Sequence, residues 1–220
     1  MASAFAPASA SVSVPGAFIH STSVDGVRVD AVAIGASAGG VSALLSLFST
    51  LQPGYRLPIF VVLHMPEDHD SGLADLFAMR LPIPVREAAD KMPIEPGTLY
   101  FAPPGYHLQV EADRSFSLSC EAPVLYSRPS IDVLFESAAY AYGPRLAALL
   151  LTGASEDGAH GMAMVSSLGG FTAVQDPDDA QIATMPLAAI ARSRPDRVLP
   201  LAGLQPLLLA LGGAAQAAGA

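Results

Sequence analysis

Residues 29–40 have the sequence VDAVAIGASAGG, and this stretch decides the fold. Its first half is apolar and rich in β-branched side chains, whereas its second half consists of small residues. An amphipathic segment with apolar residues at helical spacing follows directly and extends to Leu51. The order of these patterns predicts a buried strand, a tight turn and a helix.

The predicted turn contains the pattern Gly-x-Ser-x-Gly, with Ser37 between Gly35 and Gly39. This pattern is typical of a nucleophile elbow, in which a sharp strand-to-helix turn exposes the serine hydroxyl. The amide groups at the start of the following helix would favour the negative charge of a developing oxyanion. A phosphate-binding turn and a purely structural turn remain equally open here, although a Rossmann fingerprint would place glycine where Ser37 stands.

The composition indicates one globular domain in the cytoplasm. The 220 residues, 51% hydrophobic and 14% charged, are enough for a single domain with a sizeable core. The net charge of −9 argues against nucleic acid and anionic membrane surfaces as partners. Cys120 is the only cysteine, which excludes an internal disulfide and a thiol-rich metal site and suits a reducing compartment.

The two ends of the chain differ from its middle. We expect residues 1–28 to be a flexible leader, because they are rich in Ala, Ser and Val and lack the pattern of a signal peptide. Residues 201–211 are apolar but too short to span a bilayer, so they predict a terminal helix and no direct membrane insertion. The folded domain is therefore expected at residues 29–212, followed by a loose, disordered tail at residues 213–220.

Apolar runs alternate with helical patterns along the rest of the chain. The runs at residues 59–63 and 145–152 are continuous, as expected for strands covered on both faces. Further strands are predicted at Val85, 99–101, 108–110, 116–118 and 171–174, and helices at 71–80, 130–142, from 158 onward and at 201–211. This alternation predicts a single α/β domain with a doubly wound, mostly parallel sheet and a small hairpin.

Three chemically active side chains follow the three strongest predicted strands. Ser37 follows the first, His64 the second, and Asp157 lies a few residues after the third. The carboxyl ends of parallel strands meet at one edge of the sheet, where ligands bind. A nucleophilic serine needs a base, and the base needs an acid that holds its tautomer. This interpretation expects Nε2 of His64 to face Oγ of Ser37.

Less specific interpretations of the same residues stay open. A histidine at a strand end is more often packed or exposed than catalytic, and an aspartate before a glycine is most often a helix cap. Glu156 is a rival for Asp157 as the acid. The segment 64–70, HMPEDHD, could suggest a metal site, but Pro66 interrupts it and the HExxH spacing is absent.

From about Asp30 to Leu211, the chain resembles the catalytic domain of the bacterial chemotaxis protein-glutamate methylesterases of the CheB type. The segments that carry the resemblance are AIGASAGG at 33–40, HMP at 64–66, YFAPPGYH at 100–107, SRPSIDVLF at 127–135 and LTGASEDGAHGM at 151–162. Each is modest alone, but the set is highly specific in this order and spacing.

The resemblance implies a hydrolase that removes γ-methyl esters from glutamates of chemoreceptor-type proteins and can deamidate glutamine. It implies Ser37, His64 and Asp157 as the catalytic triad. It also implies Arg128 as a contact to substrate, with a salt bridge to the nearby acidic helix as the structural alternative. No cofactor or metal is implied, and no pattern indicates an oligomeric state.

The chain departs from the family pattern at two positions of the site. Ala38 stands where the family often has threonine, and Ala154 where it often has methionine. The backbone N–H groups of both survive these changes and are the oxyanion donors that the resemblance implies. The leader is too short for the receiver domain of typical members, so no phosphorylation control within this chain is expected. A catalytically weak binding module and a nucleotide- or phosphate-binding domain remain as alternatives.

Overall fold

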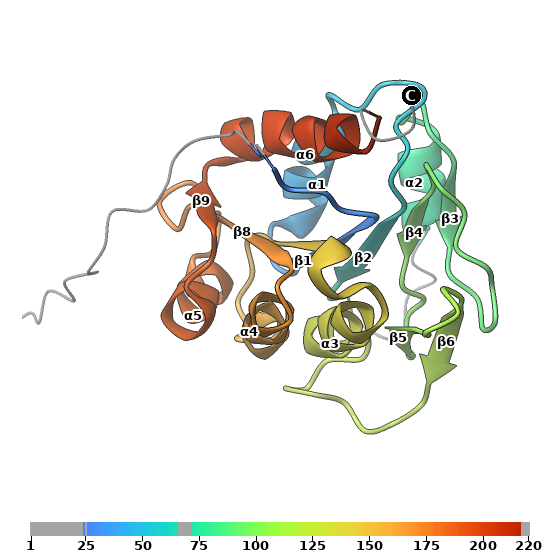
Figure 1. Ribbon diagram of the computed structural model, residues 1–220. Coiled ribbons are helices and arrows are strands. Elements are labelled where there is room, and N and C mark those ends of the chain that lie inside the picture. The colour runs from blue at the N-terminus through green and yellow to red at the C-terminus, as the bar shows by residue number, and fades with distance from the viewer. Residues whose placement is uncertain (1–23, 25, 66–71, 217–220) are drawn as a thin grey trace, which may run out of the picture.

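The computed structural model describes residue 24, residues 26–65 and residues 72–216. Within these residues, a seven-stranded sheet forms the centre of the molecule (Figure 1). Its spatial order is β3-β4-β2-β1-β7-β8-β9, and neighbouring strands are parallel. The strands are β1 (Ala31–Ala36), β2 (Ile59–Leu63), β3 (Val85–Glu87), β4 (Leu99–Phe101), β7 (Leu146–Leu150), β8 (Phe171–Gln175) and β9 (Arg197–Leu199).

Helices cover both faces of this sheet. One face carries α1 (Gly40–Phe48), α2 (Leu73–Ala78) and α6 (Leu201–Gln216), and the other carries α3 (Ile131–Tyr142), α4 (Ala159–Ser167) and α5 (Thr184–Ser193) (Figure 1). A 3₁₀ helix, η1 (Gly143–Arg145), leads into β7, and β5 (His107–Val110) and β6 (Phe116–Ser119) form an antiparallel hairpin beside α3. The predicted doubly wound, mostly parallel α/β domain with a small hairpin is confirmed.

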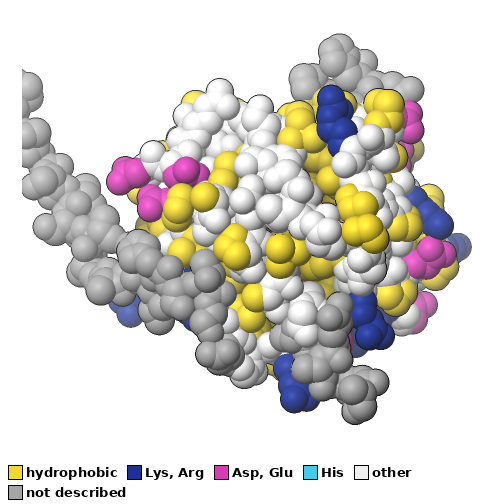
Figure 2. Space-filling model, turned by 90° about the horizontal axis from the view of Figure 1, so that it is seen from above, with side chains coloured by type: hydrophobic (Ala, Val, Ile, Leu, Met, Phe, Trp, Pro, Cys, Tyr) yellow, Lys and Arg dark blue, Asp and Glu magenta, His cyan; other side chains and the backbone are white. Residues whose placement is uncertain are grey.

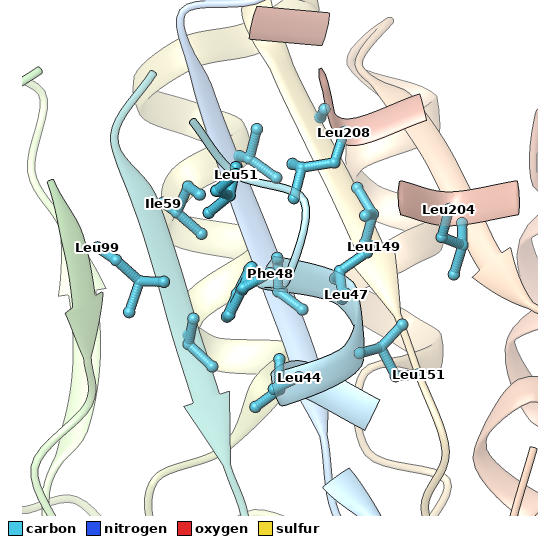
Figure 3. Close-up of a cluster of buried hydrophobic side chains, with 14 of the residues drawn as sticks. Leu44, Leu47, Phe48, Leu51, Ile59, Leu99, Leu149, Leu151, Leu204 and Leu208 are labelled. Carbon is cyan, nitrogen blue, oxygen red and sulfur yellow. The ribbon is translucent and has the colours of Figure 1, made fainter. Parts of the chain in front are cut away.

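The sheet divides the hydrophobic core into two layers. Between the sheet and helices α1 and α6, the core is dominated by large aliphatic side chains such as Leu44, Leu149 and Leu204 (Figure 3). On the α3 side, β1 presents only small residues, and a β-carbon at Gly35 would collide with Ile131. The small residues of β1 therefore allow the start of α3 to lie directly against the central strand.

Both ends of the described chain depart from the predicted boundaries. Val24 lies inside the predicted leader 1–28, yet it is buried in the core. Residues 1–23 and residue 25 of the predicted leader lie outside the described residues. Helix α6 extends to Gln216, past the predicted start of the tail at residue 213. It continues because Gly212 lacks the β-carbon that would collide with the ring of Tyr55. The sequence patterns also do not predict α5 and β9.

The surface over α6 carries little charge. Seen from this side, charged side chains lie mostly near the margins of the molecule, and the middle is apolar or polar (Figure 2). This follows from the sequence, in which no Asp, Glu, Lys or Arg occurs after Arg197. In the part of the chain that the structure describes, no helix has the length and apolar character needed to cross a membrane.

Candidate active site

The loops after β1, β2 and β7 meet at the carboxyl edge of the sheet. Ala36 pairs with Leu63 in the register of β1 and β2, so Ser37 and His64 are the next residues on two neighbouring strands. The Ser37 amide donates to the Thr152 carbonyl at 3.0 Å, which joins the first loop to the loop after β7. Helices α1 and α4 leave β1 and β7 toward opposite faces (Figure 1), so these loops flank the switch point where doubly wound sheets bind ligands.

Two glycines shape the turn that carries Ser37. Gly39 is the N-cap of α1 with φ of 80°, a left-handed conformation that favours glycine. Gly153 lies so close that a β-carbon there would be 3.0 Å from Cβ of Ser37 and 2.6 Å from Cε of Met185. Ser37 itself is half-buried. The loops after β1 and β7 therefore pack against each other through glycine, with the serine between them.

His64 and Asp157 form a hydrogen-bonded pair. Nε2 of His64 lies 2.7 Å from Oδ2 of Asp157, although 93 positions separate the two residues in sequence. The side chain of His64 is 11% exposed and that of Asp157 is fully buried. The structure therefore brings together the predicted base and the predicted acid, and Glu156, the rival acid, is exposed.

The carboxylate of Asp157 sits at the N-terminus of α3. Ile131 and Asp132 donate their amides to it at 2.7 and 3.0 Å, and Ser130 donates its hydroxyl at 2.8 Å. The alternative that Asp157 is a helix cap is thus right, but the helix that it caps is α3 and not α4. The N-cap of α4 is Gly158, and no side chain caps that helix. Asp157 instead caps the neighbouring helix, which fixes its direction toward His64.

These contacts determine the ionisation of Asp157. Burial raises the pKa of an aspartate, but the hydrogen bonds from His64 and from the amides of Asp132 and Ile131 outweigh burial and hold this pKa below its ordinary value. Asp157 is therefore a carboxylate at neutral pH. A fixed negative charge of this kind stabilises the positive charge that His64 acquires when it accepts a proton.

The expectation that Nε2 of His64 faces Ser37 is wrong, because Nε2 is the nitrogen that bonds Asp157. Nδ1 remains on the other side of the ring, 3.4 Å from Oγ of Ser127. Among the described residues, the Ser37 hydroxyl has no hydrogen bond to His64. Hydrogen bonds between nucleophile and base are often long without substrate. Nδ1 is thus the nitrogen available to accept a proton.

Sequence reasoning missed the side chains that support this pair. His107 is buried; its Nδ1 accepts from the Ser130 amide at 3.1 Å, and its Nε2 lies 3.1 Å from the Ala122 carbonyl. Ser127 comes from the loop before α3 and His107 from the start of β5, and both are distant in sequence from His64. The only signal was that both residues lie in segments that resemble the methylesterases.

Two exposed backbone amides face outward beside Ser37. The Ser37 carbonyl accepts from the Gly40 amide at 2.7 Å, and the Gly153 carbonyl accepts from the Met185 amide at 3.0 Å. The N–H of a trans peptide points opposite to its carbonyl, so the amides of Ala38 and Ala154 point away from these contacts. Within the described part of the chain, neither amide donates a hydrogen bond. Both residues are exposed, and their amides stay candidates for the oxyanion donors that the sequence predicts.

Arg128 holds a loop. Its Nη1 donates to the carbonyls of Cys120 and Glu121 at 3.3 and 3.2 Å. These contacts join the beginning and the end of the segment between β6 and α3. Arg128 therefore supports the loop that carries Ser127.

A second buried carboxylate lies beside the pair. Asp132, in the first turn of α3, accepts from the Gly161 amide of α4 at 2.7 Å. Burial and the nearby charges of Asp157 and Glu136 raise the pKa of Asp132 to about 6, against the lowering effect of the Gly161 hydrogen bond. Glu136 in turn pairs with His160 at 2.7 Å. Asp132 thus joins the starts of α3 and α4 around Asp157.

Among the residues that the structure describes, no group of three or more His, Cys, Asp or Glu side chains could hold a metal ion. Residues 66–70 of the segment HMPEDHD lie outside the described residues.

A doubly wound α/β domain with a serine turn, a histidine and a buried aspartate at its carboxyl edge has the architecture of a serine hydrolase. The profile of the CheB methylesterase family matches residues 32–208, and the chain belongs to this family. The resemblance found in the sequence is thereby confirmed.

Individual relatives agree with this assignment. A *Leptospira interrogans* protein, provisionally named protein-glutamate methylesterase/protein-glutamine glutaminase, is 41% identical over 84% of this chain and 96% of its own length. The protein-glutamate methylesterase/protein-glutamine glutaminase 2 of *Anaeromyxobacter dehalogenans* is 40% identical over 79% of this chain, which spans 51% of that relative. The crystal structure of the *Thermotoga maritima* CheB methylesterase catalytic domain is 31% identical, with a TM-score of 0.80 over 84% of this chain and 100% of that one.

Proposed function

We propose that this chain is a serine hydrolase that removes γ-methyl esters from glutamate residues of chemoreceptor-type proteins and also deamidates glutamine there. The observation that carries the proposal is the buried Asp157 carboxylate hydrogen-bonded to His64, next to the turn of Ser37. Family membership and the names of the relatives support the substrate class. Action in the cytoplasm on methylated receptor helices is part of the same proposal.

In the first half of the reaction, Oγ of Ser37 attacks the ester carbonyl while Nδ1 of His64 accepts the hydroxyl proton. Asp157 stabilises the imidazolium through Nε2. The amides of Ala38 and Ala154 bind the oxyanion of the tetrahedral intermediate. The intermediate collapses to an acyl-enzyme, and the methoxy group leaves as methanol after it takes the proton from His64.

In the second half of the reaction, water is the nucleophile and Oγ of Ser37 is the leaving group. His64 takes a proton from water, the hydroxide attacks the acyl carbonyl, and the proton returns to Oγ of Ser37 as glutamate leaves. With glutamine the leaving group is ammonia, and the other steps are the same. In this proposal Arg128, whose Nη1 also holds the loop before α3, contacts the substrate.

The test is methanol release from methyl-labelled receptor membranes by the purified chain and by Ser37→Ala. We expect Ser37→Ala to lower the rate by roughly 10⁴-fold or more, since loss of a catalytic serine removes the covalent route. Ser167→Ala, an exposed serine at the end of α4, is the matched control. Hydrolysis by Ser37→Ala near the wild-type rate would exclude Ser37 as the nucleophile. Receptor binding without methanol release by the unmodified chain would favour the binding-module alternative.

A further inference from the structure

The tip of the loop between β6 and α3 has an unusual surface. Val124 and Ser127 pair with each other through backbone hydrogen bonds of 3.1 and 2.8 Å. Between them, Leu125 and Tyr126 adopt left-handed backbone conformations, with φ of 46° and 64°. Their side chains point into solvent: Leu125 is 49% exposed and Tyr126 is completely exposed.

The fold alone does not explain these two residues. A left-handed position is accommodated most easily by glycine or asparagine, and bulky residues are uncommon there. Large apolar side chains that are held in water lose the benefit of burial. The tip therefore keeps two side chains that are unfavourable in both respects, which is typical of a surface that contacts another molecule.

The tip is fixed next to the candidate active site. Ser127 follows Tyr126 directly, and its hydroxyl lies 3.4 Å from Nδ1 of His64. Successive Cα atoms are about 3.8 Å apart, so the Cα atom of Tyr126 lies that far from the Cα atom of the residue that contacts His64. Arg128 ties the base of the loop to the carbonyls of Cys120 and Glu121. A polypeptide that presents an ester to Ser37 and His64 has to pass close to this tip.

A groove of about 710 Å³ begins at the same tip. Val124 and Leu125 contribute to its lining, together with the small side chains of Ala159, Ala188 and Ala191 of α4 and α5. The rest of the lining is Val133 and the charged or titratable side chains of Asp132, Glu136, Glu156, His160 and Arg192. The groove therefore fits a helix that carries both apolar and charged side chains, and it is continuous with the loop that contacts His64.

We propose that Leu125 and Tyr126 are a docking surface for the apolar face of the helical substrate segment that carries the glutamyl methyl ester. This inference rests on the proposed function and adds residues that determine substrate affinity. Leu125 closes the end of the groove, and Tyr126 covers the substrate helix beside the ester. The tip acts in binding the protein substrate and takes no part in the bond-breaking steps.

The experiment compares two substrates with the purified chain. One is a methylated receptor, and the other is the γ-methyl ester of N-acetylglutamate amide, which has the same ester but no flanking helix. Tyr126→Gly is the main variant, because glycine keeps the left-handed turn and removes only the ring. Tyr126→Phe keeps the ring. Tyr140→Ala is the matched control, an exposed tyrosine near the far end of α3.

For Tyr126→Gly we expect KM on the receptor to rise roughly tenfold with kcat within about twofold, as for removal of an interface aromatic. Leu125→Gly combined with Tyr126→Gly should raise KM further. Hydrolysis of the small ester should stay unchanged, and Tyr126→Phe and Tyr140→Ala should behave like the unmodified chain. An unchanged receptor KM in the double variant would overturn the docking surface and leave the proposed function intact. Absence of methanol release from receptor by the unmodified chain, with the small ester still hydrolysed, would overturn both.

Discussion

Two buried aspartates at two neighbouring helix starts have opposite properties. Asp157 precedes α4 but binds the N-terminus of α3, and Asp132 belongs to α3 but binds the N-terminus of α4. The pKa of Asp157 lies below the ordinary value, whereas burial and neighbouring negative charge raise the pKa of Asp132 to about 6. Both are buried aspartates, so the difference comes from their hydrogen bonds and from the charges beside them.

The comparison shows that a helix N-terminus alone does not hold the pKa of a buried carboxylate at or below its ordinary value. Asp157 receives four hydrogen bonds, from two amides, the Ser130 hydroxyl and His64. Asp132 accepts from the Gly161 amide, and the backbone of Gly158 also lowers its pKa, but the charge of Asp157 lies next to it and raises the pKa. Hydrogen bonds to the charged form compensate for burial only when there are enough of them.

The largest effect on either aspartate is expected for the substitution Asp157→Asn. The amide cannot accept the same set of donors and carries no charge, so His64 loses the partner that holds its tautomer. We expect kcat for methanol release to fall by roughly 10³–10⁴-fold, as when the acid of a serine triad is replaced by its amide. Steady-state assays at pH 7, with circular dichroism as a check of folding, measure the effect. A loss of less than about tenfold would contradict the assigned role of Asp157.

Ser130→Ala removes one of the four donors and the side-chain cap of α3. We expect the folded state to lose about 1–2 kcal/mol at pH 7. Since the folded-state pKa of Asp157 is lowered, its contribution to stability is present above the ordinary value and is lost as the pH falls through the folded value. Loss of this donor should raise the folded-state pKa of Asp157 toward the ordinary value, so the variant should lose less stability than the unmodified chain as the pH falls. Urea denaturation at several pH values between 3 and 7 measures both effects, and identical pH profiles would show that Ser130 does not support the charge.

Asp132→Asn replaces an aspartate by its amide, as in the first prediction. It should raise the stability of the folded state, whereas Ser130→Ala should lower it. The folded-state pKa of Asp132 is raised, so its contribution to stability is fully present below the ordinary value near 3.8 and is lost as the pH rises through about 6. Asparagine stays neutral and still accepts from Gly161. We expect the variant to be more stable than the unmodified chain by on the order of 1–2 kcal/mol at pH 7, and by much less at pH 4. Destabilisation at pH 7 would show that the charge of Asp132 is needed.

The smallest effect is expected for Glu136→Gln. Glu136 is one of the charges that raise the pKa of Asp132, but its side chain is 35% exposed and pairs with His160. The pKa of Asp132 should decrease slightly, and stability should change by less than about 0.5 kcal/mol. An NMR titration of the Asp132 carboxyl group measures the shift. An increase in this pKa would contradict the Coulombic contribution of Glu136.

The sequence predicts the parts of the fold with strong local patterns. β1, β2 and β7 are continuous apolar runs, and their ends place Ser37, His64 and the loop of Asp157 at one edge. β9 was not predicted, because it has only three residues and one of them is Arg197. The sequence patterns do not predict α5 either, since Pro186 lies near its start.

The finer arrangement of the site could not be predicted in the same way. Which ring nitrogen of His64 bonds Asp157 depends on the direction from which the loop after β2 approaches α3. The contacts of Ser127 and His107 arise from packing between segments far apart in sequence, one of which begins strand β5. Asp157 was predicted from its position after a strand, but its function as the cap of α3 requires Gly35, which allows α3 to lie against β1.

The long separation between His64 and Asp157 also has a consequence during synthesis on the ribosome. The 93 positions between them take about 5–20 s to translate at typical bacterial rates. During this time the emerging chain already contains the serine and the histidine but lacks the carboxylate that completes the pair. Under the proposed function, a nascent chain is therefore unable to demethylate receptors until β7 has joined the sheet and the loop after it has brought Asp157 to His64. Hydrolytic ability thus appears only after the chain as far as Asp157 has been synthesised and packed.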